Sequence, residues 1–318
     1  MDCGPDFPLA TLDAHLGRAH GLLDLATERV PAAALRQLDR LSKAWLVKWN
    51  NAHLPEIEAV ARRLDRPGAY FFSVNYEWGC TCRVAPSPDR QSARLIRVLD
   101  WKTPGLGRNI VAARVAAPAG RYLTLTWPGY TGVLSAVAPG RFAVALNQAP
   151  MRKAVGFFYL DWAANRRRVW NMPHPTPAHL LRSVCDEAAS FKDAVRRLSD
   201  EAISTPAIYS IAGTGAEETA VIERSETEAR VHRGAQVAAN HWQSHDWTGH
   251  ARGGDSAGRA CMMAGIAAEL DTNFEWLRNP VLNPRTRLTM VADACTGQLT
   301  AQGFEHEKPA TALLRLDV

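Results

Sequence analysis

The chain has 318 residues, of which 47% are hydrophobic and 22% are charged, and its net charge is +5. This composition supports a sizeable buried core in one large or two smaller domains, and it excludes a disordered chain. The longest basic run is Arg166-Arg167-Arg168, so we expect no nucleic-acid partner. Six cysteines at this length do not indicate a disulfide framework.

The first residues, 1–6, have neither the basic region nor the apolar core of a signal peptide. No apolar run approaches the length that a membrane-spanning helix needs. We therefore expect a cytoplasmic protein without a membrane span.

Residues 9–64 have the periodicity of helices. Apolar residues recur at steps of three and four in two stretches. These are Leu12, Leu16, Ala19, Leu22 and Leu23, followed by Leu35, Leu38, Leu41, Trp45 and Leu46. A further helix is expected to begin near Pro55 and to end at Arg66-Pro67-Gly68. The pattern predicts a small bundle of about three helices.

Beyond residue 70 the sequence becomes rich in strands. Clusters of Gly, Pro and Asn separate predicted strands at 69–75, 80–85, 93–100, 109–116, 121–126, 132–137, 141–147 and 154–160. Next come predicted helices at 177–185 and 190–199, strands at 207–213, 218–224 and 228–232, a helix at 255–270, and strands at 287–293 and 298–303. Hairpins around a block of helices predict an α+β fold of two stacked, mostly antiparallel sheets with helices outside.

One hairpin concentrates chemically useful side chains. Cys80-Thr81-Cys82 is followed by the turn residues Pro86-Ser87-Pro88-Asp89 and then by a returning strand that contains Arg97 and Asp100. Such a hairpin brings a thiol, a guanidinium and a carboxylate to one end of a sheet. That combination is typical of a nucleophilic site.

Cys-Thr, a turn, and then Arg-x-x-Asp resemble the start of the mature chain in cysteine N-terminal-nucleophile (Ntn) amide hydrolases. This family includes acid ceramidase, N-acylethanolamine-hydrolysing acid amidase, choloylglycine hydrolase and penicillin V acylase. The resemblance continues downstream through the segments 126–132, 142–147, 209–214, 220–224, 239–242, 281–283 and 294–297. It implies a four-layer αββα sandwich and an amidohydrolase that cuts itself before its cysteine. Residues 1–79 would then be a helical pro-segment or α chain, and residues 80–318 the catalytic β chain.

The nucleophile implied by the resemblance is Cys80, because a threonine follows it. Cys82 is a competitor, since side chains two residues apart on a strand share one face. The residue before Cys80 is Gly79, which suits the strained backbone of a self-cleavage site. After cleavage, the α-amine of Cys80 would have a pKa near ~8 and could act as the base.

The resemblance assigns roles to five further residues. Asp100 would orient the α-amine, and Arg97 would stabilise the thiolate. Asn147 and Asn240 would donate hydrogen bonds to the oxyanion of the tetrahedral intermediate. Arg259 would brace the site, although an ordinary surface arginine is an alternative there. Each of these residues has a structural alternative as well, such as a turn, a cap or a structural ion pair.

Two other classes of protein stay open. A metal hydrolase would use the set His241, His245, Asp246 and His250, but the glutamate of the zinc-protease motif is missing from it. A non-catalytic binding protein would keep the fold without the cut. Acyl transfer is an alternative to hydrolysis on the same site.

The resemblance implies a linear N-acyl amide as substrate, of a fatty-acyl, conjugated bile-salt or penicillin V type. We expect no cofactor and no metal. Seven apolar residues line either an acyl pocket or the ordinary core: Trp101, Trp127, Tyr130, Met151, Phe157, Phe158 and Trp242. The two cleaved chains are expected to stay together, and homo-oligomerisation is left open.

Overall fold

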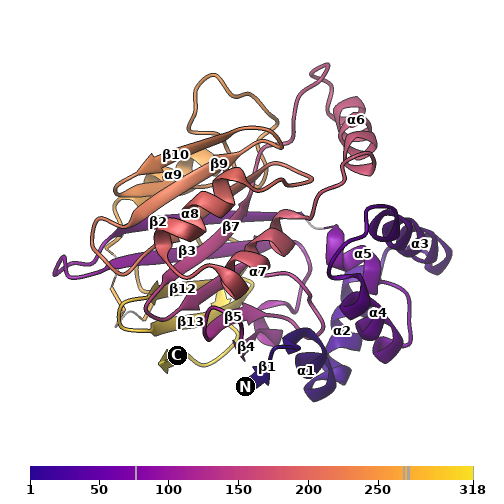
Figure 1. Cartoon of the computed structure of the whole chain (residues 1–318), viewed down its shortest axis with the longest axis horizontal. Coiled ribbons are helices and arrows are strands. Elements are labelled where there is room, and N and C mark those ends of the chain that lie inside the picture. Colours follow the sequence, from indigo (N-terminus) through magenta and orange to yellow (C-terminus); the bar gives the residue numbers. More distant parts are fainter. Residues whose placement is uncertain (76, 268, 271–272, 318) are drawn as a thin grey trace.

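A computed structural model describes residues 1–75, 77–267, 269–270 and 273–317. Within these ranges the chain forms two β-sheets with helices on their outer faces and a group of helices at one side (Figure 1). The helices are α1 (Phe7–Ala14), α2 (Leu16–Thr27), α3 (Ala32–Lys48), α4 (Leu54–Leu64), α5 (Ala69–Val74), the 3₁₀ turn η1 (Gly107–Asn109), α6 (Phe158–Trp170), α7 (Pro177–Glu187), α8 (Phe191–Asp200) and α9 (Ser256–Ala264). None of the described helices is long and apolar enough to cross a bilayer.

The first sheet has eight described strands in the order β1-β4-β5-β6-β7-β8-β9-β10. They are β1 (Asp2–Gly4), β4 (Val111–Val115), β5 (Tyr122–Thr126), β6 (Ser135–Ala138), β7 (Phe142–Gln148), β8 (Ala207–Ala212), β9 (Thr219–Arg224) and β10 (Ala229–Arg233). Neighbouring strands are antiparallel except β1 and β4, which are parallel. The amino-terminal strand therefore ties the start of the chain into this sheet.

The second sheet has seven described strands in the order β11-β2-β3-β12-β13-β14, with β15 also paired to β13. They are β2 (Trp78–Pro86), β3 (Ala93–Trp101), β11 (Gln236–Ala238), β12 (Thr286–Asp293), β13 (Gln298–Glu305), β14 (Lys308–Pro309) and β15 (Leu314–Asp317). The predicted hairpin around Thr296-Gly297 is confirmed as the β12–β13 connection, where Gly297 has a positive φ of 72°. Strands β2 and β3 are central in this sheet.

The two sheets pack face to face. Strands β2 and β3 contact β7 and β8 across the interface, and one large apolar cluster fills the space between the sheets. Helices α7 and α8 cover the first sheet, and α9 covers β2 and β11 of the second. The predicted α+β class and the four-layer αββα order are therefore confirmed.

The amino-terminal helices α1–α5 lie beside the sandwich, in indigo and purple (Figure 1). They are more numerous than the predicted three, and the predicted strand at 69–75 is wrong because α5 lies there. A short apolar run does not distinguish a strand from a helix by periodicity alone. Packing against α3 and α4 selects the helix, and the hydroxyl of Ser73 donates to the carbonyl of Ala69 one turn earlier.

The predicted strand at 154–160 is also wrong. The carboxylate of Asp161 accepts hydrogen bonds from the backbone amides of Ala154, Val155 and Gly156, so these groups are not available to a strand partner. A loop followed by α6 results. The predicted helix at 255–270 ends at Ala264, and residue 268 lies outside the described residues.

Candidate active site

The β2–β3 hairpin sets the register of the candidate site. Gly79 lies opposite Asp100, Cys80 opposite Leu99, and Cys82 opposite Arg97. Both cysteines are fully buried on the face of β2 that looks into the space between the sheets. The alternating pattern of the sequence thus places the thiols beside the arginine of the next strand.

Arg97 is a fully buried cation with its guanidinium at the sulfur of Cys80. Its Nη2 lies 3.2 Å from the Sγ of Cys80. Its Nη1 donates to the backbone carbonyls of Leu134 at 2.8 Å and Leu146 at 3.0 Å. These two bonds fix the guanidinium in place, so that it is already oriented to stabilise a thiolate.

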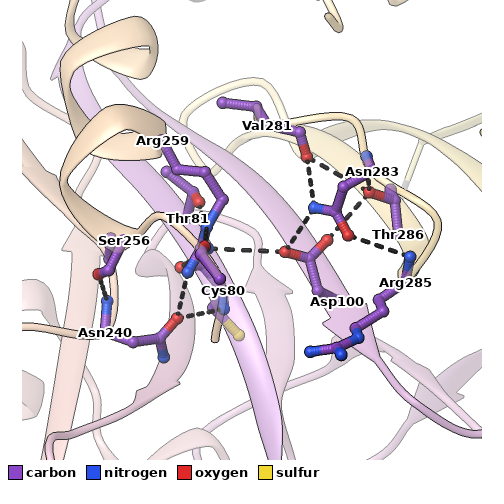
Figure 2. A network of polar contacts seen from close by, with 12 residues as sticks. Cys80, Thr81, Asp100, Asn240, Ser256, Arg259, Val281, Asn283, Arg285 and Thr286 are labelled. Atoms are coloured by element: carbon purple, nitrogen blue, oxygen red, sulfur yellow. Dashed lines mark hydrogen bonds and ion pairs between the residues drawn. The ribbon is translucent and has the colours of Figure 1, made fainter. Parts of the chain in front are cut away.

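Asn240 and Arg259 hold the backbone of Cys80 (Figure 2). The amide of Cys80 donates to the Oδ1 of Asn240 at 2.8 Å. Arg259 donates through Nη1 to the Cys80 carbonyl at 2.7 Å and through Nη2 to the same Asn240 oxygen at 2.9 Å. Arg259 is buried, with 1% of its surface exposed, which contradicts the alternative of a surface arginine. The two residues therefore fix the strand at the Gly79–Cys80 bond.

Asp100 is buried beside Gly79. Its carboxylate accepts hydrogen bonds from Thr286 at 2.9 Å and from the side-chain amide of Asn283 at 3.0 Å, and Nη1 of Arg259 lies 3.6 Å away (Figure 2). A Cβ added to Gly79 would lie 3.4 Å from its Oδ2. Burial raises the pKa of Asp100, while Arg259 opposes this shift.

Sequence reasoning gave Asn283 and Thr286 no role, although the resemblance did include the segment 281–283. Their contact with Asp100 depends on the turn that returns the chain into β12, where Thr286 pairs with Asp100. The asparagine and threonine in the turn just before the predicted strand 287–293 were the signal that could have identified them.

Asn147 faces the second cysteine. Its Oδ1 accepts a hydrogen bond from the thiol of Cys82 at 3.0 Å. Its side-chain amide donates to the carbonyls of Ala238 at 3.1 Å and Ala239 at 3.2 Å. Both amide hydrogens are thus engaged in joining β7 to the segment before Asn240. The oxyanion role of Asn147 stays a prediction.

Both thiols are protonated at neutral pH. Burial raises the pKa of Cys80 to about 12, against the opposing effect of Arg97. Burial also raises the pKa of Cys82. Whichever of the two cysteines is the nucleophile, a base close to its sulfur is therefore needed to remove the thiol proton.

A cavity of about 680 Å³ reaches the wall formed by Gly79 and Asp100. Trp101, Met151 and Phe158 contribute apolar surface to this cavity, and Arg252 and His250 contribute polar groups. Cys80 lies directly behind Gly79 and has no exposed surface. Cleavage after Gly79 would place a new amino terminus at this wall.

The other aromatic candidates are distributed between core and surface. Trp127 is buried in the core, Tyr130 and Trp242 pack against it, and Phe157 is 57% exposed. Only three of the seven apolar candidates therefore line the described cavity, namely Trp101, Met151 and Phe158.

The alternative metal site is not assembled. The side chain of His241 bonds to Ser256, that of Asp246 to Arg230, and that of His250 to Asp161. Among the described residues, no three His, Cys, Asp or Glu side chains converge in the manner of a metal site. The structure therefore gives the metal-hydrolase alternative no support.

No protein-family model matches the chain, and no curated protein is similar to it in sequence. Among solved structures, an N-acylethanolamine-hydrolyzing acid amidase ortholog from Caenorhabditis elegans is 22% identical, with a TM-score of 0.50 over 67% of this chain and 92% of that one. Conjugated bile acid hydrolase from Clostridium perfringens is 11% identical (TM-score 0.43, over 75% and 92%). Penicillin V acylase from Agrobacterium tumefaciens is 14% identical (TM-score 0.41, over 75% and 86%).

The likeness to the C. elegans protein shows that this chain has the same fold. The four-layer αββα architecture implied by the sequence resemblance is in agreement with it. A shared fold does not determine a function, so the chemistry must be argued from the site.

Proposed function

We propose that the chain is a self-processing cysteine amidohydrolase of the Ntn type, with Cys80 as its nucleophile. The observation that carries this proposal is the guanidinium of Arg97, fixed 3.2 Å from the Cys80 sulfur next to the Gly79–Cys80 bond. A cation held at a buried thiol stabilises the thiolate, the form of the cysteine that acts as a nucleophile.

In the proposed self-cleavage, the Sγ of Cys80 attacks the carbonyl carbon of Gly79. A C–S bond forms, the C–N bond breaks, and the Cys80 nitrogen receives the thiol proton. Water then hydrolyses the thioester to give the Gly79 carboxylate and a free thiol. Asn240 and Arg259, which bind the amide and the carbonyl of Cys80, would hold the peptide during this step.

In the proposed mature enzyme, the α-amine of Cys80 is the base. It takes the thiol proton, and Arg97 stabilises the resulting thiolate. The thiolate attacks the substrate carbonyl, the leaving amine receives the proton, and water hydrolyses the acyl-thioester. Asp100 lies beside Gly79 and would orient the new amine, while Asn240 would donate from its side-chain amide to the oxyanion once that amide releases the carbonyl of Gln148.

Residues 1–79 would form the α chain and residues 80–318 the β chain. Their contacts support lasting association after the cut. Strand β1 belongs to the first sheet, and Glu56 in α4 makes a two-pronged ion pair with Arg182 in α7.

The proposed substrate is a linear N-acyl amide, such as a fatty-acyl amide. The apolar surface of Trp101, which lines the cavity and packs against Trp127, supports an apolar acyl group. The solved structure of the same fold carries the name of an enzyme that hydrolyses N-acylethanolamines, which makes this class a reasonable first screen.

The test is intact-mass spectrometry with amino-terminal sequencing of the wild type and of Cys80→Ala. We expect the wild type to separate into two pieces that begin at Met1 and at Cys80, and Cys80→Ala to stay whole. A wild-type chain that stays whole from acidic to neutral pH, and that hydrolyses no acyl amide, would contradict the proposal.

A further inference from the structure

A carboxylate–imidazole pair lies at the cavity that reaches Gly79, and the proposed reaction uses neither group. His250 lines this cavity, and its Nε2 is 2.8 Å from the Oδ2 of Asp161. Asp161 itself is completely buried at the start of α6. Two segments distant in sequence thus meet at one wall of the cavity.

The environment of Asp161 keeps it ionised. Its carboxylate accepts hydrogen bonds from the backbone amides of Val155 at 2.7 Å, Ala154 at 2.8 Å and Gly156 at 3.0 Å. These bonds lower the pKa of Asp161 to about 2, and the bond from Val155 has the largest effect. A carboxylate accepts but does not donate, so the neutral imidazole of His250 must carry its hydrogen on Nε2.

The other ring nitrogen of His250 is available. The backbone of His250 is fixed by a reciprocal pair of hydrogen bonds with Met151, at 2.8 and 2.9 Å, and its ring packs edge-on against Phe158. Within the described part of the chain, Nδ1 has no hydrogen-bond partner. The cavity therefore contains a rigid imidazole with one free acceptor.

The chemistry of an N-acyl amide decides which half of the substrate such an acceptor would meet. An apolar acyl chain offers no hydrogen-bond donor, whereas an amine part can carry a hydroxyl or an N–H group. A hydrogen-bond acceptor in a binding site discriminates against a substrate analogue that lacks the donor group, because the acceptor then has no hydrogen-bond partner.

We propose that His250 is a specificity-determining residue that accepts, through Nδ1, a hydrogen bond from a donor group on the leaving amine. Asp161 is a positioning residue that fixes the tautomer and the direction of the ring. This inference rests on the proposed amidohydrolase function. It adds a selective contact that the resemblance did not assign.

Two probes that differ in one donor group test the proposal: N-lauroyl ethanolamide and N-lauroyl propylamide. The measured quantity is the ratio of their kcat/KM values, which does not depend on the fraction of active enzyme. We expect the wild type to favour the ethanolamide by about tenfold, the usual effect of one hydrogen bond.

The decisive variant is His250→Gln. The glutamine amide can still donate to Asp161 from the position of Nε2, but it has no group at the position of Nδ1. We expect His250→Gln to be processed normally and to show a ratio near one. The matched control His245→Gln changes an exposed histidine of the same loop and should keep the wild-type ratio.

Three results would overturn the inference: a wild-type ratio near one, a His250→Gln ratio equal to that of the wild type, or a His250→Gln chain that is not processed. The last would mean that the pair serves the precursor and not the selection of substrate. Failure of the proposed function is recognised separately, because the wild type itself would then stay whole and hydrolyse neither probe.

Discussion

The guanidinium of Arg97 and the thiol of Cys80 lie 3.2 Å apart, although neither side chain has exposed surface. Two backbone carbonyls, those of Leu134 and Leu146, hold the cation at this position. Since the thiol is protonated, the positive charge faces a neutral sulfur. The arrangement favours any step that generates the thiolate.

Arg97→Lys tests this relationship. A lysine keeps the charge, but its single ammonium cannot serve both carbonyls and the sulfur with the geometry of the planar guanidinium. We expect self-cleavage and amide hydrolysis to slow by roughly 10–100-fold, the effect of weakening one charged hydrogen bond. The rate of appearance of the Cys80 amino terminus measures the first effect, and thermal unfolding verifies that the chain is folded. Cleavage at the wild-type rate would show that the charge alone suffices.

Gly253 gives a way to disturb the site without changing a proposed catalytic residue. It has a φ of +70°, and a Cβ there would lie 2.7 Å from the Nη2 of Arg259 and 3.4 Å from the Oδ1 of Asn240. Gly253→Ala should therefore push Arg259 away from Asn240 and slow processing by about tenfold or more, the effect of weakening one charged hydrogen bond.

The neighbouring Gly254→Ala is the matched control, because a Cβ at that position meets nothing within 4 Å and its φ is not in the left-handed region. Processing of Gly254→Ala should match the wild type. Equal processing in both alanine variants would mean that the Arg259–Asn240 contact is dispensable.

The part of the site that could be predicted from sequence is local. The alternation of β2 and β3 and the turn between them were sufficient to bring Cys80 and Arg97 together, because a hairpin has few registers. The contacts of Asp100 with Asn283 and Thr286 could not be foreseen, since they bridge about 180 residues through the packing of β12 on β3.

The two wrong strands have a different cause. In the run at 69–75 the apolar side chains satisfy either a helix or a strand, and only packing against α3 and α4 decides. In the run at 154–160 the buried carboxylate of Asp161 takes the amides that a strand would have used. A buried acid of this kind cannot be recognised from periodicity.

Cys82→Ser separates the two candidate nucleophiles. A serine keeps a donor for the Oδ1 of Asn147, which now accepts from Cys82 at 3.0 Å. If Cys80 is the nucleophile, Cys82→Ser should still be cut between Gly79 and Cys80, with a rate within about tenfold of the wild type, because only a packing and hydrogen-bond contact has changed. Amino-terminal sequencing reads the position of the cut. Loss of cutting in Cys82→Ser, or a wild-type fragment that begins at Cys82, would transfer the role to that residue.

The contact between the helical segment and the sandwich should weaken in acid. The rings of His53 and His179 lie 4.4 Å apart, beside the ion pair of Glu56 and Arg182. Burial lowers the pKa of His53 from 6.5 to about 4, and the positive charge of Arg182 is the second, smaller cause of this shift. A histidine whose pKa is lowered by folding stabilises the fold above its unfolded pKa, and this contribution is lost as the pH falls through the folded value.

Glu56 acts in the opposite direction, because burial raises the pKa of its carboxyl: the folded chain takes up this proton before the unfolded chain does, so this group stabilises the fold as the pH falls. The expected acid sensitivity belongs to His53, whose pKa is lowered by folding. The free energy of unfolding should therefore decrease by about 1–3 kcal/mol for His53 between pH 6.5 and pH 4, from the one-unit value of ~1.4 kcal/mol. His53→Phe keeps a ring against His179 but does not titrate, so its loss of stability over this interval should be smaller. His306→Asn, at an exposed turn, should behave as the wild type. Denaturant unfolding at pH 6.5 and pH 4 measures this difference, with every variant made in the Cys80→Ala background so that the chain stays whole. If the free energy of unfolding of His53→Phe fell by as much as that of Cys80→Ala alone, the acid sensitivity would belong to other groups.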